Sequence, residues 1–409
     1  MNQVIQSVRC VCLPLLALLA WVPAAGAATI SASSCSQSDV QAALTAASGG
    51  DTVMVPAGTC SWTSLAISKG IRLKGAGASA TNITVTGVVS VRRVASHGFE
   101  LSGFSFRKTN DSSEHMFLID GASDAAMPLI HDNVFTVSNS GIIRYETNGG
   151  VIYGNTFNGD LDDSAIQHKL ISDDNLSWRT LDTMGVRDTD GRSNLYIEDN
   201  AFNGMANQAL DFDDSSRVVF RHNVLTSSSV NSHGRDTSPV GVRHYEIYAN
   251  EFLYPDSQVN QVWMIWLRGG TGVIFDNTFD DIRGQMWGDK IEIRMSVRAA
   301  DEGGVDGCCT VWPCRRQVGQ TYAVDPVDGR EKELTDGVRF WGNAGNPAWE
   351  LARWENTCGN DDITVFLREG RDFAFSPSPK PGYSPFPYPH PVRADAGPRP
   401  LPPTGISVQ

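Results

Sequence analysis

Three short stretches of the chain, ALDFD, NSHGRD and MIWLR, carry side chains that can move protons and bind anions. Their chemically capable residues, counting the position after ALDFD, are Asp211, Asp213, Asp214, His233, Arg235, Trp266 and Arg268. Histidine changes charge near neutral pH, and arginine binds a carboxylate through two N–H groups. The set is therefore suited to proton transfer on an anionic substrate.

One reaction that fits these residue types is β-elimination from a uronic acid. It needs a cation for the sugar carboxylate, a base for the α-proton, and an acid for the leaving oxygen. We expect Arg268 and Arg235 to bind the carboxylate and His233 to serve as base or acid. Trp266 offers a flat apolar surface for a sugar ring. Alternatively, His233 is an ordinary surface histidine of a Ser/Gly/Asp-rich loop.

The carboxylates have more than one interpretation. Asp211, Asp213 and Asp214 could bind Ca²⁺, which prefers several oxygen ligands, and Asp211 and Asp213 could also take part in catalysis. In an inverting glycoside hydrolase, two such carboxylates lie about 6.5–9.5 Å apart. The plain alternative for DFDD is a solvated strand edge or a turn.

Four further residues are candidates for substrate binding. Arg144 and Glu146 lie two positions apart in IIRYE, and a surface ion pair explains them equally well. Arg243 and His244 lie near the start of a strand in VRHYE.

Residue alternation predicts which of these side chains face outward. In a strand, successive side chains point to opposite faces. With Leu210 and Phe212 inward, Asp211 and Asp213 point outward. The same rule turns Arg144 and Glu146 outward when Ile143 and Tyr145 point inward, and Trp266 and Arg268 outward when Ile265 and Leu267 point inward. We expect NSHGRD to place His233 and Arg235 between Asp211 and Arg268.

A repeated phrase, aliphatic–x–x–Asn–x–Phe, indicates the elements that position these strands. Its copies are IHDNVF (130–135), IYGNTF (152–157), IEDNAF (197–202), FRHNVL (220–225), IYANEF (247–252), IFDNTF (274–279) and a degenerate FWGNAG (340–345). The shorter spacings, 22–27 residues, are typical of a solenoid. β-Branched and aromatic residues dominate each copy, which favours strands over helices.

The repeated asparagine predicts a stacked corner. Asparagine tolerates the left-handed conformation, so we expect it to turn the chain between two strands. Stacked amides would bond along the axis at about 4.8 Å, and the Phe after each one would form a core column. A looser copy, FELSGFSF (99–106), places Gly103 at the asparagine position.

These features resemble exported right-handed parallel β-helix proteins of the pectate-lyase-like superfamily. The resemblance rests on DVQAAL…GGDTVMVPAGTC, the Asn-x-Phe repeat and the coil period, and covers roughly residues 35–345. It implies an all-β, right-handed parallel β-helix. That superfamily holds lyases, hydrolases, epimerases, esterases and non-catalytic surface proteins. The motifs of polygalacturonases and pectate lyases do not match, so no catalytic residue is carried over.

The chain divides into three predicted parts. Residues 1–27 resemble a signal peptide, because Arg9 precedes a short apolar run that ends in AAGA. Residues 28–375 form the β-helix, with a capping helix at 36–47 and inserted loops at about 159–192 and 283–339. Residues 376–409 are a Pro-rich tail. We expect the part up to His390 to lie along the last coils, and disorder from Arg393 onward.

The cysteines fit an exported protein. Cys35 and Cys60 bracket one N-terminal unit and are expected to pair. Cys308, Cys309, Cys314 and Cys358 allow three pairings, and a metal site is the alternative for CCTVWPC.

Composition excludes some classes of function. The net charge of −13 argues against general nucleic-acid binding. No stretch after residue 27 is long and apolar enough to span a membrane. The main hypothesis is a secreted or periplasmic, monomeric polysaccharide lyase that acts on an acidic glycan, with Ca²⁺ as a possible cofactor. The alternatives are an inverting glycoside hydrolase and a non-catalytic glycan-binding or surface-adhesion solenoid.

Overall fold

The computed structural model describes most of the chain between residues 26 and 393. The described residues are 26–94, 97–108, 114–121, 126–160, 164–170, 190–205, 208–234, 241–254, 263–280, 291–293, 312–314, 317–324, 331–345, 349–351 and 363–393.

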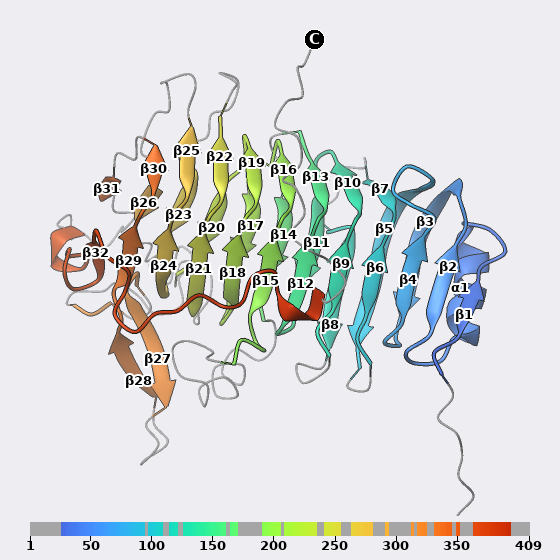
Figure 1. Cartoon of the computed structure of the whole chain (residues 1–409), viewed down its shortest axis with the longest axis horizontal. Helices are drawn as coiled ribbons and strands as arrows, with labels where there is room; N and C mark the ends of the chain where they lie inside the picture. Colours follow the sequence, from blue (N-terminus) through green and yellow to red (C-terminus); the bar gives the residue numbers. More distant parts are fainter. Residues whose placement is uncertain are drawn as a thin grey trace, which may run out of the picture.

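The chain winds into coils that stack along one axis, from α1 (Gln37–Ala46) at one end to β32 at the other (Figure 1). One side of this stack is a 12-stranded parallel sheet. In spatial order its strands are β1 (Thr29–Ser31), β2 (Thr52–Val55), β4 (Arg72–Gly75), β6 (Glu100–Ser102), β9 (Leu129–His131), β12 (Gly150–Tyr153), β15 (Leu195–Glu198), β18 (Arg217–Arg221), β21 (His244–Tyr248), β24 (Thr271–Phe275), β29 (Val338–Trp341) and β32 (Phe373–Phe375).

Two further sides are joined through the long strands β3 (Gly58–Ile67) and β5 (Thr81–Arg93). The first stack comprises β7 (Ser105–Lys108), β10 (Val134–Val137), β13 (Thr156–Asn158), β16 (Ala201–Asn203), β19 (Val224–Thr226), β22 (Glu251–Leu253), β25 (Thr278–Asp280) and β30 (Ala344–Gly345). The second stack comprises β8 (Phe117–Gly121), β11 (Gly141–Tyr145), β14 (Ser164–His168), β17 (Gln208–Phe212), β20 (Val230–Ser232), β23 (Ile265–Leu267), β26 (Ile291–Ile293) and β31 (Trp349–Leu351). The predicted parallel β-helix is confirmed.

A continuous asparagine ladder links the 12-stranded sheet to the first stack. Its members are Asn133, Asn155, Asn200, Asn223, Asn250, Asn277 and Asn343. In every link, the backbone N–H and the side-chain Nδ2 of one asparagine both donate to Oδ1 of the next, at 2.9–3.1 Å. The predicted stacking of the amides is therefore confirmed.

The left-handed residue at each corner is the one before the asparagine, so the prediction for asparagine itself is wrong. The residues with φ of 53–62° are Asp132, Gly154, Asp199, His222, Ala249, Asp276 and Gly342. Gly103 shifts in the same way: Ser102 pairs with His131, so Gly103 aligns with Asp132 and has a φ of 80°. The turn is made one residue early, which leaves the asparagine amide to bond along the axis.

Phenylalanine rings stack inside the coils, as the repeat predicts. Phe106, Phe135, Phe157 and Phe202 follow one another with centroids 5.7, 5.1 and 4.8 Å apart. All four are fully buried. The observed register between coils is strongly favoured over a shifted one, because a slip of one residue would turn these phenylalanine rings outward.

The N-terminal end is closed by α1, as predicted. Ser36 caps the helix by accepting a hydrogen bond from the backbone N–H of Asp39. Cys35 and Cys60 form the expected disulfide. Cys314 is also disulfide-bonded. Cys308, Cys309 and Cys358 lie outside the described residues, so the three predicted pairings stay open.

The two insertions are narrower than predicted, because each predicted span contains a coil strand. β14 lies within 159–192, and β26 lies within 283–339. The second span also holds an antiparallel hairpin of β27 (Gln320–Val324) and β28 (Glu331–Thr335).

After β32 the chain turns back and runs over the outer surface of the 12-stranded sheet toward β12 (Figure 1). Two 3-10 turns, Ile363–Val365 and Pro391–Arg393, flank this region. Arg393 is buried, which contradicts the expected disorder at that residue. Residues 1–25 and 394–409, including most of the predicted signal peptide, are not described. Within the described residues, no helix is long and apolar enough to cross a membrane.

Candidate functional site

The outer surface of the second stack carries one aligned side chain per coil. Along the axis these are Arg144, Gln167, Asp211, Asn231, Trp266 and Glu292, which we call the polar row. Adjacent members lie about 4.8 Å apart along the axis, as neighbouring strands do. The residues predicted to point inward, Ile143, Tyr145, Leu210, Phe212, Ile265 and Leu267, are all in the core. The face assignment by alternation is therefore confirmed.

At the centre of the polar row, His233 lies between Asp211 and Arg268. Its Nε2 is 2.7 Å from Oδ1 of Asp211 and 2.5 Å from Nη2 of Arg268. The proton on Nε2 decides the partner: a protonated nitrogen donates to Asp211, and an unprotonated one accepts from Arg268. This Asp–His–Arg cluster is the arrangement that alternation predicted, and it couples a proton to the position of a guanidinium.

The backbone of β20 carries His233 to this place. Its N–H donates to the carbonyl of Phe212, and its carbonyl accepts from Val242. The bond to Phe212 extends the parallel pairing with β17 beyond Ser232. The His233 side chain is 13% exposed, which leaves one route of access from solvent.

Asp211 is held on three sides. Gln167 donates to Oδ2 at 3.1 Å, and Asn231 donates to Oδ1 at 3.2 Å. Burial by itself raises the pKa of Asp211, but His233, Gln167 and Arg268 together hold that pKa below its usual value. Asp211 is therefore ionised at neutral pH and can stabilise a positive imidazole.

Arg268 is oriented by Ser232 and by an aromatic platform. Its Nε donates to the Ser232 carbonyl at 3.2 Å, and its backbone N–H donates to the Ser232 hydroxyl at 3.1 Å. The guanidinium lies 4.1 Å from the centre of the Trp266 ring. Trp263 packs against Trp266, with ring centroids 4.2 Å apart. Two tryptophans thus form an apolar wall beside the cation.

Asp213 differs sharply from Asp211. Burial raises the pKa of Asp213 to about 7, with Asp214 and Asp211 adding to the rise and His233 opposing it. Its Oδ1 accepts from the backbone N–H of Asp214 at 2.8 Å, in a turn where Asp214 and Ser215 have φ of 38° and 63°. One carboxylate of this stretch is thus ionised while another is partly protonated near neutral pH.

The donor set does not fit Ca²⁺ well. Among the described residues, no three His, Cys, Asp or Glu side chains are arranged to hold a metal ion, and Asp211, Asp213 and Asp214 are no exception. Both oxygens of Asp211 already accept hydrogen bonds from side chains.

The four further candidates for substrate binding lie in or beside strands of two different sheets. Arg144 belongs to the polar row and also forms the ion pair with Glu146 that was the alternative interpretation. Arg243 and His244 are 0% and 4% exposed, and His244 begins β21 of the 12-stranded sheet. Neither residue belongs to the polar row, and substrate binding by either stays a prediction. Arg235 lies outside the described residues.

The sequence did not predict three members of the polar row, Gln167, Asn231 and Glu292, or the contact between the Trp263 and Trp266 rings. Gln167 belongs to β14, which the 45-residue step between two asparagines concealed. Asn231 lies in β20, two residues before His233, so alternation alone could have placed it.

Comparison with known proteins agrees with the architecture. Residues 69–252 match the family model described as the right handed beta helix region. None of the curated proteins matches the sequence. Among solved structures, an alginate lyase from Paenibacillus sp. str. FPU-7 is 11% identical, with 82% of this chain and 97% of that chain covered and a TM-score of 0.34.

Two other solved structures show similar values. A mutant of the PL6 family alginate lyase AlyGC is 14% identical with a TM-score of 0.43, over 87% of this chain and 52% of that one, so the match spans about half of the lyase. The pectin methylesterase PemA from Erwinia chrysanthemi is 10% identical with a TM-score of 0.36, over 81% and 93%. The coil geometry, the ladder and the family match lead to one conclusion: the chain is a right-handed parallel β-helix protein.

Proposed function

We propose that this protein is an exported polysaccharide lyase that cleaves an acidic glycan by β-elimination on the polar row. The observation that carries the proposal is the Asp–His–Arg cluster, in which one imidazole nitrogen lies within reach of both a carboxylate and a guanidinium. The Trp263–Trp266 wall beside Arg268 supports a sugar as the substrate.

In this proposal Arg268 binds the uronate carboxylate and lowers the cost of removing the neighbouring proton. In the reacting tautomer Nε2 of His233 carries the proton and donates a hydrogen bond to Asp211, so the Arg268 guanidinium can turn toward the substrate. The other imidazole nitrogen removes the α-proton. The bond from the β-carbon to the leaving oxygen breaks, a carbon–carbon double bond forms, and the imidazolium returns its proton to that oxygen. No net proton is consumed.

The setting of the reaction follows from the same features. The Cys35–Cys60 disulfide favours an oxidising compartment, so we propose that the protein acts in the periplasm or outside the cell. The substrate is a polyuronate chain that lies along the row, with about one sugar per coil rise of ~4.8 Å. We propose that the working unit is a monomer, because one chain supplies the whole cluster.

One observation favours an inverting hydrolase as the second candidate. The pKa of Asp213 is raised to about 7 while that of Asp211 is lowered, and such a split separates an acid from a base. A hydrolase of this kind would use Asp213 as the acid and Asp211 to activate water.

A screen of polyuronates and neutral glycans separates these functions. A lyase gives an unsaturated sugar end that absorbs in the ultraviolet, and a hydrolase gives reducing ends without that absorbance. We expect His233→Ala to lower the lyase rate by about 10²–10⁴-fold, the usual contribution of a general base. Product formation without ultraviolet absorbance would replace the lyase with the hydrolase, and retention on glycan gels without any product would indicate a binding protein.

Chelation tests the role of calcium separately. Because the Asp211 oxygens are already engaged by Gln167 and Asn231, we expect lyase activity to persist after dialysis against EDTA. Loss of activity, restored by added Ca²⁺, would return the metal to the site.

A further inference from the structure

The C-terminal segment Tyr383–Arg393, which we call the arm, is bound to the body as a peptide ligand is bound to a groove. Its sequence after Tyr383 is SPFPYPHPVR, with proline at every second place from 385 to 391. None of it belongs to a strand of the body, so no sheet pairing holds it. Proline-rich segments dock in aromatic grooves at low entropic cost, because their backbone is already extended.

The groove lies on the outer surface of the 12-stranded sheet. Its apolar part is a cluster separate from the core, composed of Val151, Tyr153, Tyr196, Val219, Tyr248, Val273, Phe275 and Trp341, with Phe386 of the arm. Tyr383 contacts the edges of Phe275 and Trp341, each with centroids 5.6 Å apart. The arm thus covers an apolar surface that the coils themselves leave outside.

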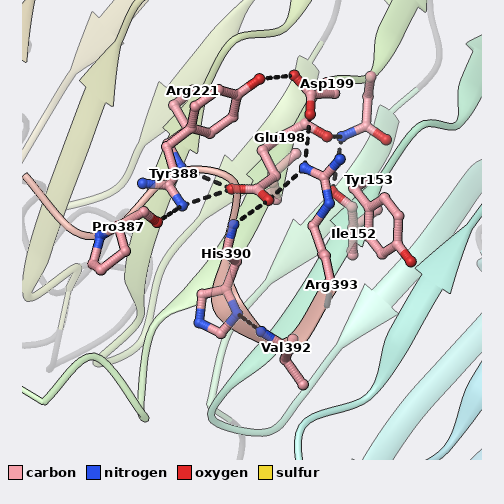
Figure 2. A network of polar contacts seen from close by, with 12 residues as sticks. Ile152, Tyr153, Glu198, Asp199, Arg221, Pro387, Tyr388, His390, Val392 and Arg393 are labelled. Carbon is pink, nitrogen blue, oxygen red and sulfur yellow. Dashed lines mark hydrogen bonds and ion pairs between the residues drawn. The ribbon is translucent and has the colours of Figure 1, made fainter. Parts of the chain in front are cut away.

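Polar side chains in the groove form hydrogen bonds with the main chain of the arm (Figure 2). Arg221 donates to the carbonyls of Phe386 and Pro387, each at 2.8 Å. Glu198 accepts from the backbone N–H of His390 at 3.0 Å. These contacts fix the direction and register of the arm without regard to its side chains.

Side chains of the arm add specificity. The hydroxyl of Tyr388 donates to Asp199, and its ring stacks on His222 at 3.7 Å. Nη1 of Arg393 lies 2.5 Å from Glu198 and 2.7 Å from Asp199. The same guanidinium lies 4.2 Å from the centre of the Tyr153 ring. Without the arm, the described part of the groove retains the carboxylates of Glu198, Asp199 and Glu246 beside the Arg221 guanidinium, and so favours a cationic residue.

Two features make the arm exchangeable. It is joined to β32 by residues 376–382, of which Pro377, Ser378, Pro379, Pro381 and Gly382 are exposed. Within the described residues, Nε and Nη2 of the buried Arg393 have no hydrogen-bond partner, and unsatisfied buried donors weaken the anchor. Every contact named above is made by a side chain, a backbone carbonyl or a backbone N–H of the arm, which the same segment of another copy can supply equally well.

We propose that this groove is a binding site for an extended, proline-rich segment that ends in arginine, and that the arm of a second copy fills it when the chain's own arm is released. Exchange of an identical element is a low-cost route to a dimer. The site lies on a different face from the polar row and does not depend on the proposed lyase activity.

The test uses the full chain with a protease site inserted in residues 377–381. After cleavage, the protein is incubated with a fluorescent peptide of residues 383–393. We expect the peptide to displace the cleaved arm and to bind in the micromolar range, while the uncleaved protein binds at least tenfold more weakly. Failure of an excess of peptide to displace the cleaved arm would overturn the proposal.

Matched variants test the recognition. In the peptide, Arg393→Ala is expected to weaken binding by at least tenfold, whereas Val392→Ala, at an exposed position, is expected to have no effect. In the body, Asp199→Asn tests the same contact and tolerates the left-handed φ of 57° at that corner. Equal binding of both peptide variants would contradict the assigned anchor.

Exchange between copies is measured directly. Two full-length populations, labelled on the arm and on the body respectively, are mixed at high concentration and followed by energy transfer. A slow rise in transfer that free peptide suppresses supports arm exchange, and constant transfer at all concentrations argues against a second copy as the occupant.

Discussion

At the residue scale, Arg268 is the group on which the proposed chemistry depends most directly. Its guanidinium is held by the Ser232 carbonyl, by Trp266 and by His233. The charge is therefore placed before the substrate arrives, which is the condition for efficient electrostatic catalysis.

We expect Arg268→Lys to lower kcat/KM on a polyuronate by about 10²-fold, because lysine cannot form the bidentate bond or stack on Trp266. The matched control is Arg144→Lys. Arg144 is 37% exposed and paired with Glu146, so we expect a change of less than about threefold there. Steady-state rates followed by ultraviolet absorbance of the unsaturated product would measure both. Equal losses in the two variants would remove Arg268 from its special role.

Sequence reasoning found the centre of the site and missed its borders. Asp211, His233 and Arg268 could be placed together because alternation and coil order are local rules. Gln167 could not, since the inserted residues around β14 hide the repeat.

At the element scale, the corner asparagines carry much of the fold's specificity. Asn223 shows the pattern: its Nδ2 donates to Ile197, Arg221 and Asn250, and its Oδ1 accepts twice from Asn200. The side chain is completely buried, so each lost bond leaves a group without water.

We expect Asn223→Ala to destabilise the protein by roughly 3 kcal/mol or more, since several buried donors and acceptors lose their partners together. Asn158→Ala is the control, because Asn158 is only partly buried and makes two side-chain bonds, of 3.0 and 3.4 Å. We expect it to cost less than about 1 kcal/mol. Chemical denaturation of both variants is the measurement, and similar losses would contradict a special role for the ladder.

A histidine inside β14 makes stability depend on pH. His168 is fully buried, and burial lowers its pKa to about 4, although its Nδ1 bonds to the carbonyl of Tyr145. In the unfolded chain His168 is therefore protonated below about pH 6.5, whereas in the folded chain it is protonated only below about pH 4. Its contribution to the free energy of unfolding is intact above pH 6.5 and falls as the pH drops toward 4.

We expect this single group to remove about 3 kcal/mol of stability between pH 6.5 and 4. His168→Phe keeps the ring and cannot be protonated, so its unfolding free energy should fall less steeply with acid than that of the natural protein. A slope in His168→Phe equal to the natural one would show that other groups determine the acid response.

The repeat predicted the fold well because a coil is defined by short-range chemistry. The phrase aliphatic–x–x–Asn–x–Phe specifies one corner, one inward ring and one strand on each side. The left-handed residue was misplaced by one position, because aspartate, glycine, histidine and alanine all occupy the true site and no single residue type marks it. The path of the arm had no local signal, since its hydrogen bonds to the 12-stranded sheet join residues 137–195 positions apart.

At the scale of the whole molecule, the arm joins coils that the sequence keeps apart. A solenoid is held by contacts between neighbouring coils, so its ends open first. The arm begins beside β29 and ends beside β12, and thereby ties the C-terminal coils to the middle of the stack.

We expect Arg393→Gln to speed hydrogen exchange in β24 and β29 by about tenfold, because the last coils then open without first releasing a buried ion pair. Exchange in β2 and β4, which the arm does not touch, should stay the same. Mass spectrometry of peptides from the two regions gives both rates in one experiment. A uniform increase along the whole chain would indicate general destabilisation.

The asparagine ladder has a last consequence, for how such a molecule changes its length. Each rung bonds only to its two neighbours, so nothing within one coil records how many others exist. A gene with residues 200–222 duplicated in tandem would encode an extra turn and a rod about 4.8 Å longer, with both termini untouched. Recombination can therefore lengthen the molecule by whole coils. A duplication that does not contain a whole number of coils would place a side chain other than asparagine in the ladder.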